Sequence, residues 1–222
     1  GRIGYNYDRR YYLTLTARAD GASNFSASHK WGFFPAAAFR WTIKNEDFLL
    51  HATWLNDLSL RLSAGRSGND AISAYKSLNL VNTGRGSWVF GHQYNLTSYP
   101  QQIANRELTW ETTDSFNLGL NFEAFRSRLK IEADLYWSRT SDLLLTVKQS
   151  QVIGYDKYLD NFGNTENYGV EVTISSDNIR RKNFVWSTDL IISHNTQTVT
   201  DSGAGDEVVP TYTKGTQYLY GY

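Results

Sequence analysis

Residues 116–137, FNLGLNFEAFRSRLKIEADLYW, decide the fold that we expect for this chain. From position 129 to position 138, apolar residues at 129, 131, 133, 135 and 137 alternate with mostly charged or polar neighbours. A period of two over such a length is typical of a strand with one apolar and one polar face. Residues 116–122 alternate in the same way, and a polar turn at about residues 123–128 joins the two segments. The stretch therefore predicts an antiparallel hairpin.

The same alternation recurs about eight times along the chain, as expected of an all-β protein. Two stretches lack it, and we expect each of residues 65–107 and 139–167 to form one long loop. We expect a turn with about one helical coil over residues 44–57, a short turn near residues 177–183, and a polar tail from Thr196. The expected connections alternate between short and long. The full set of expected strands covers residues 3–8, 11–20, 33–42, 58–64, 116–122, 129–138, 169–175 and 186–195.

Two architectures fit these strands: a soluble sheet with its apolar face on a core, and a transmembrane barrel with that face in lipid. Alternating connection lengths favour the barrel, because its turns are short at one end and its loops long at the other. The polar face carries charges in nearly every strand, and each Arg or Lys turned to the bilayer midplane would cost about 2–4 kcal/mol. The pattern therefore favours an antiparallel transmembrane β-barrel whose charged face lines the lumen, with the soluble sheet as the alternative. The predicted lumen-facing charges are Arg18, Arg40, Arg61, Lys130, Glu132, Asp134, Glu171 and Asp189.

Composition narrows the possible functions. The 222 residues carry 22 basic and 22 acidic side chains, so no excess charge favours nucleic acid as a partner. No apolar run approaches the ~20 residues of a transmembrane helix, and no signal peptide is recognisable. The sequence contains no cysteine, which excludes disulfides and thiolate metal sites. It contains no methionine either, even at position 1, so we expect these residues to belong to a longer polypeptide.

No catalytic constellation emerges, and we expect neither an enzyme nor a cofactor or metal. The histidines at 29, 51, 92 and 194 are scattered without metal-ligand spacing. Residues 160–166 offer oxygen ligands, but their spacing does not match an EF-hand, which favours hydrogen-bonded turn residues. The first long loop holds Trp88, Phe90, Tyr94 and Tyr99, candidate ligand contacts because aromatic faces stack on sugars and peptides. The alternative is that these rings pack on one another.

Several ordered motifs resemble the SusC/RagA-type family of TonB-dependent outer-membrane transporters of the Bacteroidetes. They are RADGASNF (18–25), WGFFPAAAFRW (31–41), WLNDLSLRLSAGRSGN (54–69), NRELTWETT (105–113), RLKIEADLYWSRTSDLLL (128–145), NFGNTENYGVEVTI (161–174) and the final YGY. The sequence departs from the family pattern at three places. Arg106 stands where the family usually has proline, Tyr168 stands where it usually has lysine, and the turn at residues 65–69 contains Arg66 and Ser67. These departures affect loop detail rather than the fold.

The resemblance implies a barrel of about 22 strands closed around a plug. Residues 1–222 would be one part of that barrel domain, with about eight strands and without the plug, the signal peptide or the TonB-contacting segment. The implied function is import of oligosaccharides or peptides across the bacterial outer membrane, with a SusD-like surface lipoprotein and with TonB, bound through the absent N-terminal part. Two alternatives from other classes are a non-transporting barrel or adhesin and a soluble carbohydrate-binding or hydrolytic β domain.

Overall fold

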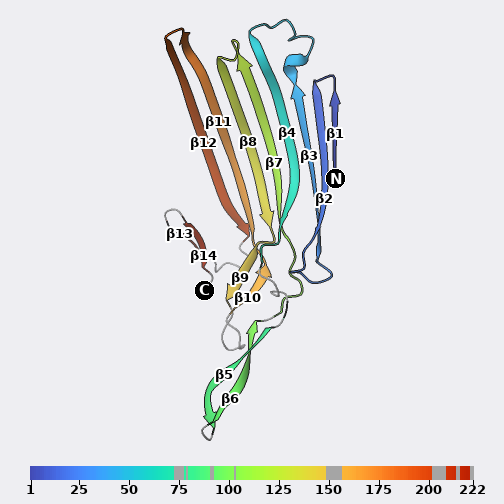
Figure 1. The fold of residues 1–222 in the computed structure, drawn as a ribbon, viewed down its shortest axis with the longest axis vertical. Coiled ribbons are helices and arrows are strands. Elements are labelled where there is room, and N and C mark those ends of the chain that lie inside the picture. Colours follow the sequence, from blue (N-terminus) through green and yellow to red (C-terminus); the bar gives the residue numbers. More distant parts are fainter. Residues whose placement is uncertain are drawn as a thin grey trace.

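The computed structural model describes residues 1–72, 78, 80–90, 93–102, 104–148, 157–201, 209–213 and 216–220. Its main feature is one sheet of eight strands in the order β1-β2-β3-β4-β7-β8-β11-β12, each antiparallel to its neighbours (Figure 1). Because each strand pairs with the next sheet strand in the sequence, the sheet is an up-and-down meander. The strands are β1 (Arg2–Tyr7), β2 (Tyr11–Gly21), β3 (Trp31–Thr42), β4 (Leu55–Asn69), β7 (Glu111–Ala124), β8 (Leu129–Ser141), β11 (Asn164–Arg181) and β12 (Phe184–Asp201).

The alternation in the sequence becomes two chemically distinct faces. One cross-strand row joins Phe39, Leu62, Leu118, Leu135 and Val170 from five neighbouring strands. The next row, on the opposite face, joins Arg40, Arg61, Gly119, Asp134 and Glu171. We call these the apolar face and the charged face. The apolar face is largely uncovered, with Ile3 71% exposed and Leu135 52% exposed. The sheet is an open part of a barrel, with β1 and β12 at its edges.

The two ends of the sheet differ as predicted (Figure 1). At one end, the connections are the short turns at residues 8–10, 125–128 and 182–183 and the segment 43–54, which starts with the 3-10 helix η1 (Ile43–Asn45). At the other end, the connections are residues 22–30, 70–110 and 142–163. We call these the short-turn end and the long-loop end. The expected turn with a helical coil over residues 44–57 is found in part: η1 covers only Ile43–Asn45, and residues 55–57 already belong to β4.

The prediction of a single loop over residues 65–107 was wrong. Strand β4 continues through Asn69, and β5 (Leu80–Phe90) and β6 (Gln93–Gln102) form a separate hairpin beyond the long-loop end (Figure 1). The sequence of residues 80–102 shows no regular alternation of apolar and polar residues, so periodicity gave no signal. Their strand structure rests on backbone pairing between β5 and β6.

The other predicted loops were also too long. Strand β8 runs to Ser141 and β11 starts at Asn164, with a short ladder of β9 (Leu144–Lys148) and β10 (Lys157–Asn161) between them. The turn expected near residues 177–183 is mostly strand: β11 continues through a bulge between Asp177 and Ile179. The tail begins as strand β12, and β13 (Val209–Thr213) pairs with β14 (Thr216–Tyr220). The ends of these strands are polar and show no alternation of apolar and polar residues. Backbone pairing continues through them, so the sequence pattern underestimates the length of the strands.

The main cluster of buried apolar residues lies at the long-loop end, while Leu55 and Ala124 are buried at the short-turn end. It consists of Ala22, Phe25, Phe34, Leu108 and Trp110, each at most 8% exposed. The partly buried side chains of Ile72, Leu144 and Leu159 pack against it. These residues come from three connections and one strand, so the cluster gathers the bases of the long loops over one end of the sheet.

Candidate functional site

The predicted lumen-facing charges all lie on the charged face, and the central feature is an ion pair that spans a strand. Arg61 on β4 and Asp134 on β8 are separated by β7, yet an Arg61 Nη atom lies 3.0 Å and 3.2 Å from the two Asp134 carboxylate oxygens. The residue between them in register is Gly119. A Cβ atom there would lie 2.6 Å from Asp134 Oδ1 and 2.8 Å from an Arg61 nitrogen. The glycine therefore provides the space in which the two side chains meet.

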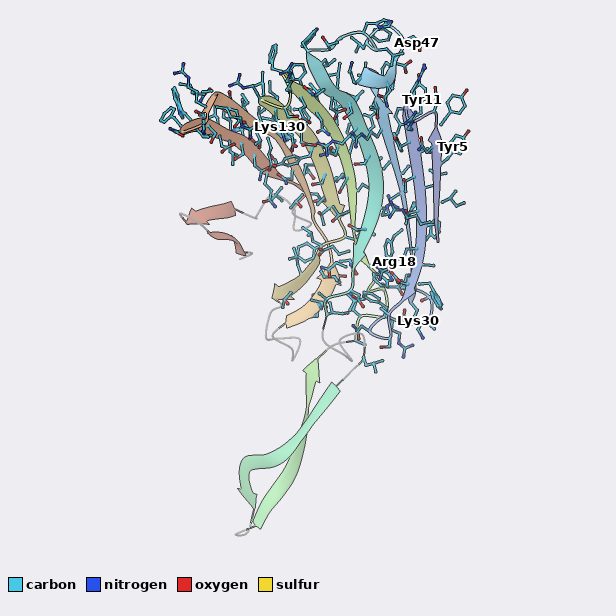
Figure 2. All side chains as sticks on the ribbon, turned by 45° about the horizontal axis from the view of Figure 1, so that its top comes forward. Tyr5, Tyr11, Arg18, Lys30, Asp47 and Lys130 are labelled. Carbon is cyan, nitrogen blue, oxygen red and sulfur yellow. The ribbon has the colours of Figure 1, made fainter. Side chains whose placement is uncertain are left out.

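Three further charges have local partners. Arg40 donates to Asp57 at 3.5 Å and to the fully buried Ser59 hydroxyl at 3.3 Å. Arg18 pairs with Asp20 on its own strand, toward the long-loop end (Figure 2). Lys130 lies 3.9 Å from Glu123, across the β7–β8 pair and near the short-turn end (Figure 2). These pairs are partly exposed, so each contributes little to stability.

The remaining predicted charges are acidic and uncompensated. Within the described part of the chain, Glu132, Glu171 and Asp189 form no ion pair. Glu171 on β11 is the register partner of Asp134 on β8, so two carboxylates lie side by side on the charged face. The arginines at 18, 40 and 61 lie on β2, β3 and β4, whereas these carboxylates lie on β8, β11 and β12. The charged face is thus polarised: a cationic group passing over it is attracted toward the β8–β12 side.

The four aromatic candidates lie on the β5–β6 hairpin instead of in an unstructured loop. Trp88 and Phe90 belong to β5, and Tyr94 and Tyr99 belong to β6. Tyr94 is the register partner of Val89. Their side chains fall outside the part of the molecule that the structure describes, so ligand contact by these rings stays a prediction.

The cluster at the long-loop end is built around Trp110. Its ring lies 5.3 Å from Phe34 in an edge-on arrangement and 5.5 Å from Phe25. Phe34 projects from β3 over Gly68 of β4, where a Cβ atom would lie 2.1 Å from the phenyl ring. Aromatic pairs in this geometry stabilise beyond their buried area. The contacts fix the segments 22–30 and 104–110 to the charged face.

Asparagine side chains join the same loops through backbone hydrogen bonds. Asn161 accepts the Thr109 N–H at 2.8 Å and donates to the carbonyls of Thr109 and Asp142, each at 2.9 Å. Asn105 donates to Leu159 O at 3.1 Å and to Asp160 Oδ1 at 2.8 Å. Asp160 and Asn161 are therefore hydrogen-bonded residues at the end of strand β10, rather than the turn residues that we expected. No group of three or more histidine or acidic side chains suited to a metal occurs among the described residues.

Sequence reasoning did not select these loop anchors, although a signal was present. Phe25 ends the RADGASNF motif, Asn105 and Trp110 lie in NRELTWETT, and Asn161 begins NFGNTENYGVEVTI. Three of the motifs that carry the family resemblance thus contain residues that fix the bases of the long loops. Their shared role becomes visible only when the three segments meet in space.

A polar network holds the short-turn end. The Glu46 carboxylate, 9% exposed as a residue, accepts hydrogen bonds from Tyr11 Oη at 2.6 Å, Trp41 Nε1 at 2.8 Å and Arg10 Nη1 at 3.0 Å. The hydrogen bonds from Tyr11 and Trp41 lower the pKa of Glu46, against desolvation, and Arg10 adds to the lowering. Tyr11 and Trp41 also stack with ring centres 6.3 Å apart on the apolar face. Glu46 thus joins this aromatic pair to the segment that connects β3 and β4.

The geometry defines a class of protein: the wall of an up-and-down barrel with one apolar and one charged face. The chain belongs to the family described as TonB dependent receptor-like, beta-barrel, which residues 3–220 match. It is a family of receptors and transporters rather than of enzymes. No helix among the described residues is long and apolar enough to cross a membrane.

Individual relatives agree with this assignment. The chain is 37% identical over 211 residues to the TonB-dependent receptor SusC of Bacteroides thetaiotaomicron, covering 93% of this chain and 21% of that protein. It is 36% identical over 206 residues to the TonB-dependent receptor P26 of Formosa agariphila, with the same coverage of each chain. The structure of the RagAB peptide transporter superposes with a TM-score of 0.84 at 27% identity, over 100% of this chain and 24% of that one. The chain therefore spans about a fifth of the length of the curated relatives it matches.

Proposed function

We propose that residues 1–222 form part of the barrel wall of a SusC-type importer in the bacterial outer membrane. The complete protein takes up oligosaccharides or peptides, a SusD-like lipoprotein covers its extracellular side, and TonB supplies energy through the plug. The observation that carries the proposal is the eight-strand meander with its uncovered apolar face. A transporter wall requires such a sheet, because strands that cross a bilayer must turn apolar side chains to lipid and pair their backbone groups laterally.

The short-turn end supports an orientation with the short turns in the periplasm. Barrels of this kind have short periplasmic turns and long extracellular loops. On the apolar face, the rings of Tyr7, Tyr11 and Trp41 stack at this end, with centres 6.4 Å and 6.3 Å apart. Tyr and Trp gather where a bilayer meets water. The long loops, with the β5–β6 hairpin, then face the outside of the cell, where cargo and a lipoprotein partner bind.

The charged face then lines the lumen. Its uncompensated carboxylates Glu132, Glu171 and Asp189 contact the plug or the cargo path, on the side of the wall away from the arginines. Arg61 and Asp134 neutralise each other across Gly119 and hold β4, β7 and β8 in register. The pairs formed by Arg40 and Lys130 also join neighbouring strands, whereas Asp20 neutralises Arg18 within β2.

The test is a deletion of the full-length gene, followed by growth on defined oligosaccharides and on defined peptide mixtures as single nutrient sources. We expect loss of growth on one of the two cargo classes, and restoration by the intact gene. A second complementing gene carries a plug in which the TonB-contacting segment is deleted, and we expect it not to restore growth. Normal growth of the deletion strain on every oligosaccharide and peptide, with binding to surfaces lost instead, would favour an adhesin.

A further inference from the structure

A hollow at the short-turn end is lined by arginine and aromatic side chains that the proposed transport function does not use. Thr53, Trp54, Phe125, Arg126, Arg128 and Arg180 surround a volume of about 720 Å³, which we call the rim hollow. It forms because β11 continues past the β7–β8 turn, and the Asp177 N–H donates to Arg128 O at 2.7 Å at that step. The segment before β4 closes another side, where the Phe125 N–H donates to Trp54 O at 2.7 Å.

The rim hollow has an excess of positive charge. Arg180 is paired with Asp177 at 3.5 Å. Arg126 and Arg128 form no ion pair within the described part of the chain. The backbone of Phe125, Arg126 and Ser127 is left-handed, with φ of 57°, 57° and 64°. The Ser127 N–H donates to Asn56 Oδ1 at 3.2 Å, and this hydrogen bond fixes the turn. The fixed turn holds the guanidinium groups of Arg126 and Arg128 beside the hollow.

The aromatic wall places the rim hollow at the level of the membrane surface. The Trp54 ring lies 6.1 Å from Phe125 and 6.4 Å from Phe122, which belongs to the apolar face. Trp54 is 51% exposed and Phe125 55% exposed. Tryptophan side chains such as Trp54 at the edge of an apolar face lie at the depth of lipid headgroups. Arginine is well suited to phosphate there, because its planar group donates two hydrogen bonds and it is less strongly hydrated than lysine.

We infer that the rim hollow is a binding site for the phosphodiester headgroup of an anionic phospholipid in the inner leaflet of the outer membrane. Arg126 and Arg128 bind the phosphate, and Trp54 and Phe125 contact the glycerol and upper acyl chains, while Arg180, paired with Asp177, lies toward the charged face. The inference rests on the proposed function, because only a barrel with periplasmic short turns brings this site to that leaflet. A basic pocket at a membrane surface is a recurrent site for anionic headgroups.

The experiment uses the full-length protein purified in a nonionic detergent and titrated separately with short-chain phosphatidylglycerol, short-chain phosphatidylcholine and inorganic phosphate. We expect saturable binding of phosphatidylglycerol and much weaker binding of the other two. Removing one arginine costs about fivefold in affinity and removing two about thirtyfold, if each contributes about 1 kcal/mol. R126Q/R128Q is therefore expected to lose about thirtyfold, whereas R126K/R128K, which keeps the charges, loses only a few-fold.

R9Q is the matched control, because Arg9 is an exposed arginine with φ of 51° in the β1–β2 turn and does not line the hollow. We expect R9Q to bind phosphatidylglycerol normally. Unchanged binding by R126Q/R128Q would overturn the site, and equal binding of inorganic phosphate with the same arginine dependence would make it a free-anion site instead. Growth on cargo is measured for the same variants: R126Q/R128Q that imports cargo but binds no lipid supports both proposals. A wild-type protein that binds lipid at these arginines but imports no cargo would contradict only the transport function.

Discussion

The two ends of the sheet are held by different chemistry. At the long-loop end, Trp110 and four other residues, each at most 8% exposed, form a cluster, and asparagine side chains bond the loop backbone. At the short-turn end, the carboxylate of Glu46 gathers Arg10, Tyr11 and Trp41. Long loops need the larger apolar cluster because the entropy of ordering them is large, whereas the short-turn end combines two buried apolar residues, Leu55 and Ala124, with polar contacts. The comparison predicts that the long-loop end is sensitive to lost volume and the short-turn end to pH.

The largest expected effect comes from Trp110→Ala at the long-loop end. Removing a buried tryptophan costs about 3–5 kcal/mol, and here the loss falls on the loop bases. We expect hydrogen exchange in residues 22–30 and 104–110 of the full-length protein to accelerate strongly, while β8 stays protected. Trp31→Ala is the matched control, because Trp31 is 71% exposed. In this variant, hydrogen exchange in residues 22–30 and 104–110 should be as slow as in the wild-type protein. Protected loops in the Trp110 variant would contradict the role given to the cluster.

A smaller effect is expected between the two ends, at Gly119. An alanine there would force Arg61 and Asp134 apart, and overpacking of this kind costs about 1–3 kcal/mol. Gly4→Ala adds a methyl group to the same face of β1 with no atom within 4 Å, so its stability should be unchanged. Guanidinium unfolding of the detergent-solubilised full-length protein measures both variants. Equal midpoints for the two would mean that the ion pair does not depend on the glycine.

The smallest effect is expected from pH at the short-turn end. The pKa of Glu46 is lowered in the folded protein from its ordinary value of 4.5. A carboxyl group with a lowered folded pKa stabilises fully above its unfolded pKa and loses that contribution as pH falls through the folded value. We therefore expect the stability of the wild-type protein to fall below about pH 4.5, and to fall more than that of the Glu46→Gln variant. The measurement is the unfolding midpoint of both proteins at several pH values. Parallel pH profiles for the two proteins would contradict this network.

Side-chain patterning predicted the strands that have two different faces. The alternation over residues 129–138 gave β8 and its charged face, because burial and charge select residues at every second position there. The same reasoning failed for β5 and β6, whose sequences carry no such alternation although their backbones pair. Each of the eight charged residues could be assigned to one face of the sheet from its place in the alternation of its strand. That Arg61 reaches Asp134 could not, because the contact depends on the register of three strands and on the small size of Gly119.

The central claim is that the charged face lines a water-filled lumen and the apolar face meets lipid. Glu171 and Val172 are neighbours on β11 that point to opposite faces. The measurement is labelling of Glu171→Cys and Val172→Cys in the full-length protein, in outer membranes and in a background without other reactive cysteines. The account predicts that a charged, water-soluble maleimide labels only the position 171 variant and that a lipid-partitioning maleimide labels mainly the position 172 variant. The reverse pattern, or equal labelling of both by the water-soluble reagent, would contradict it.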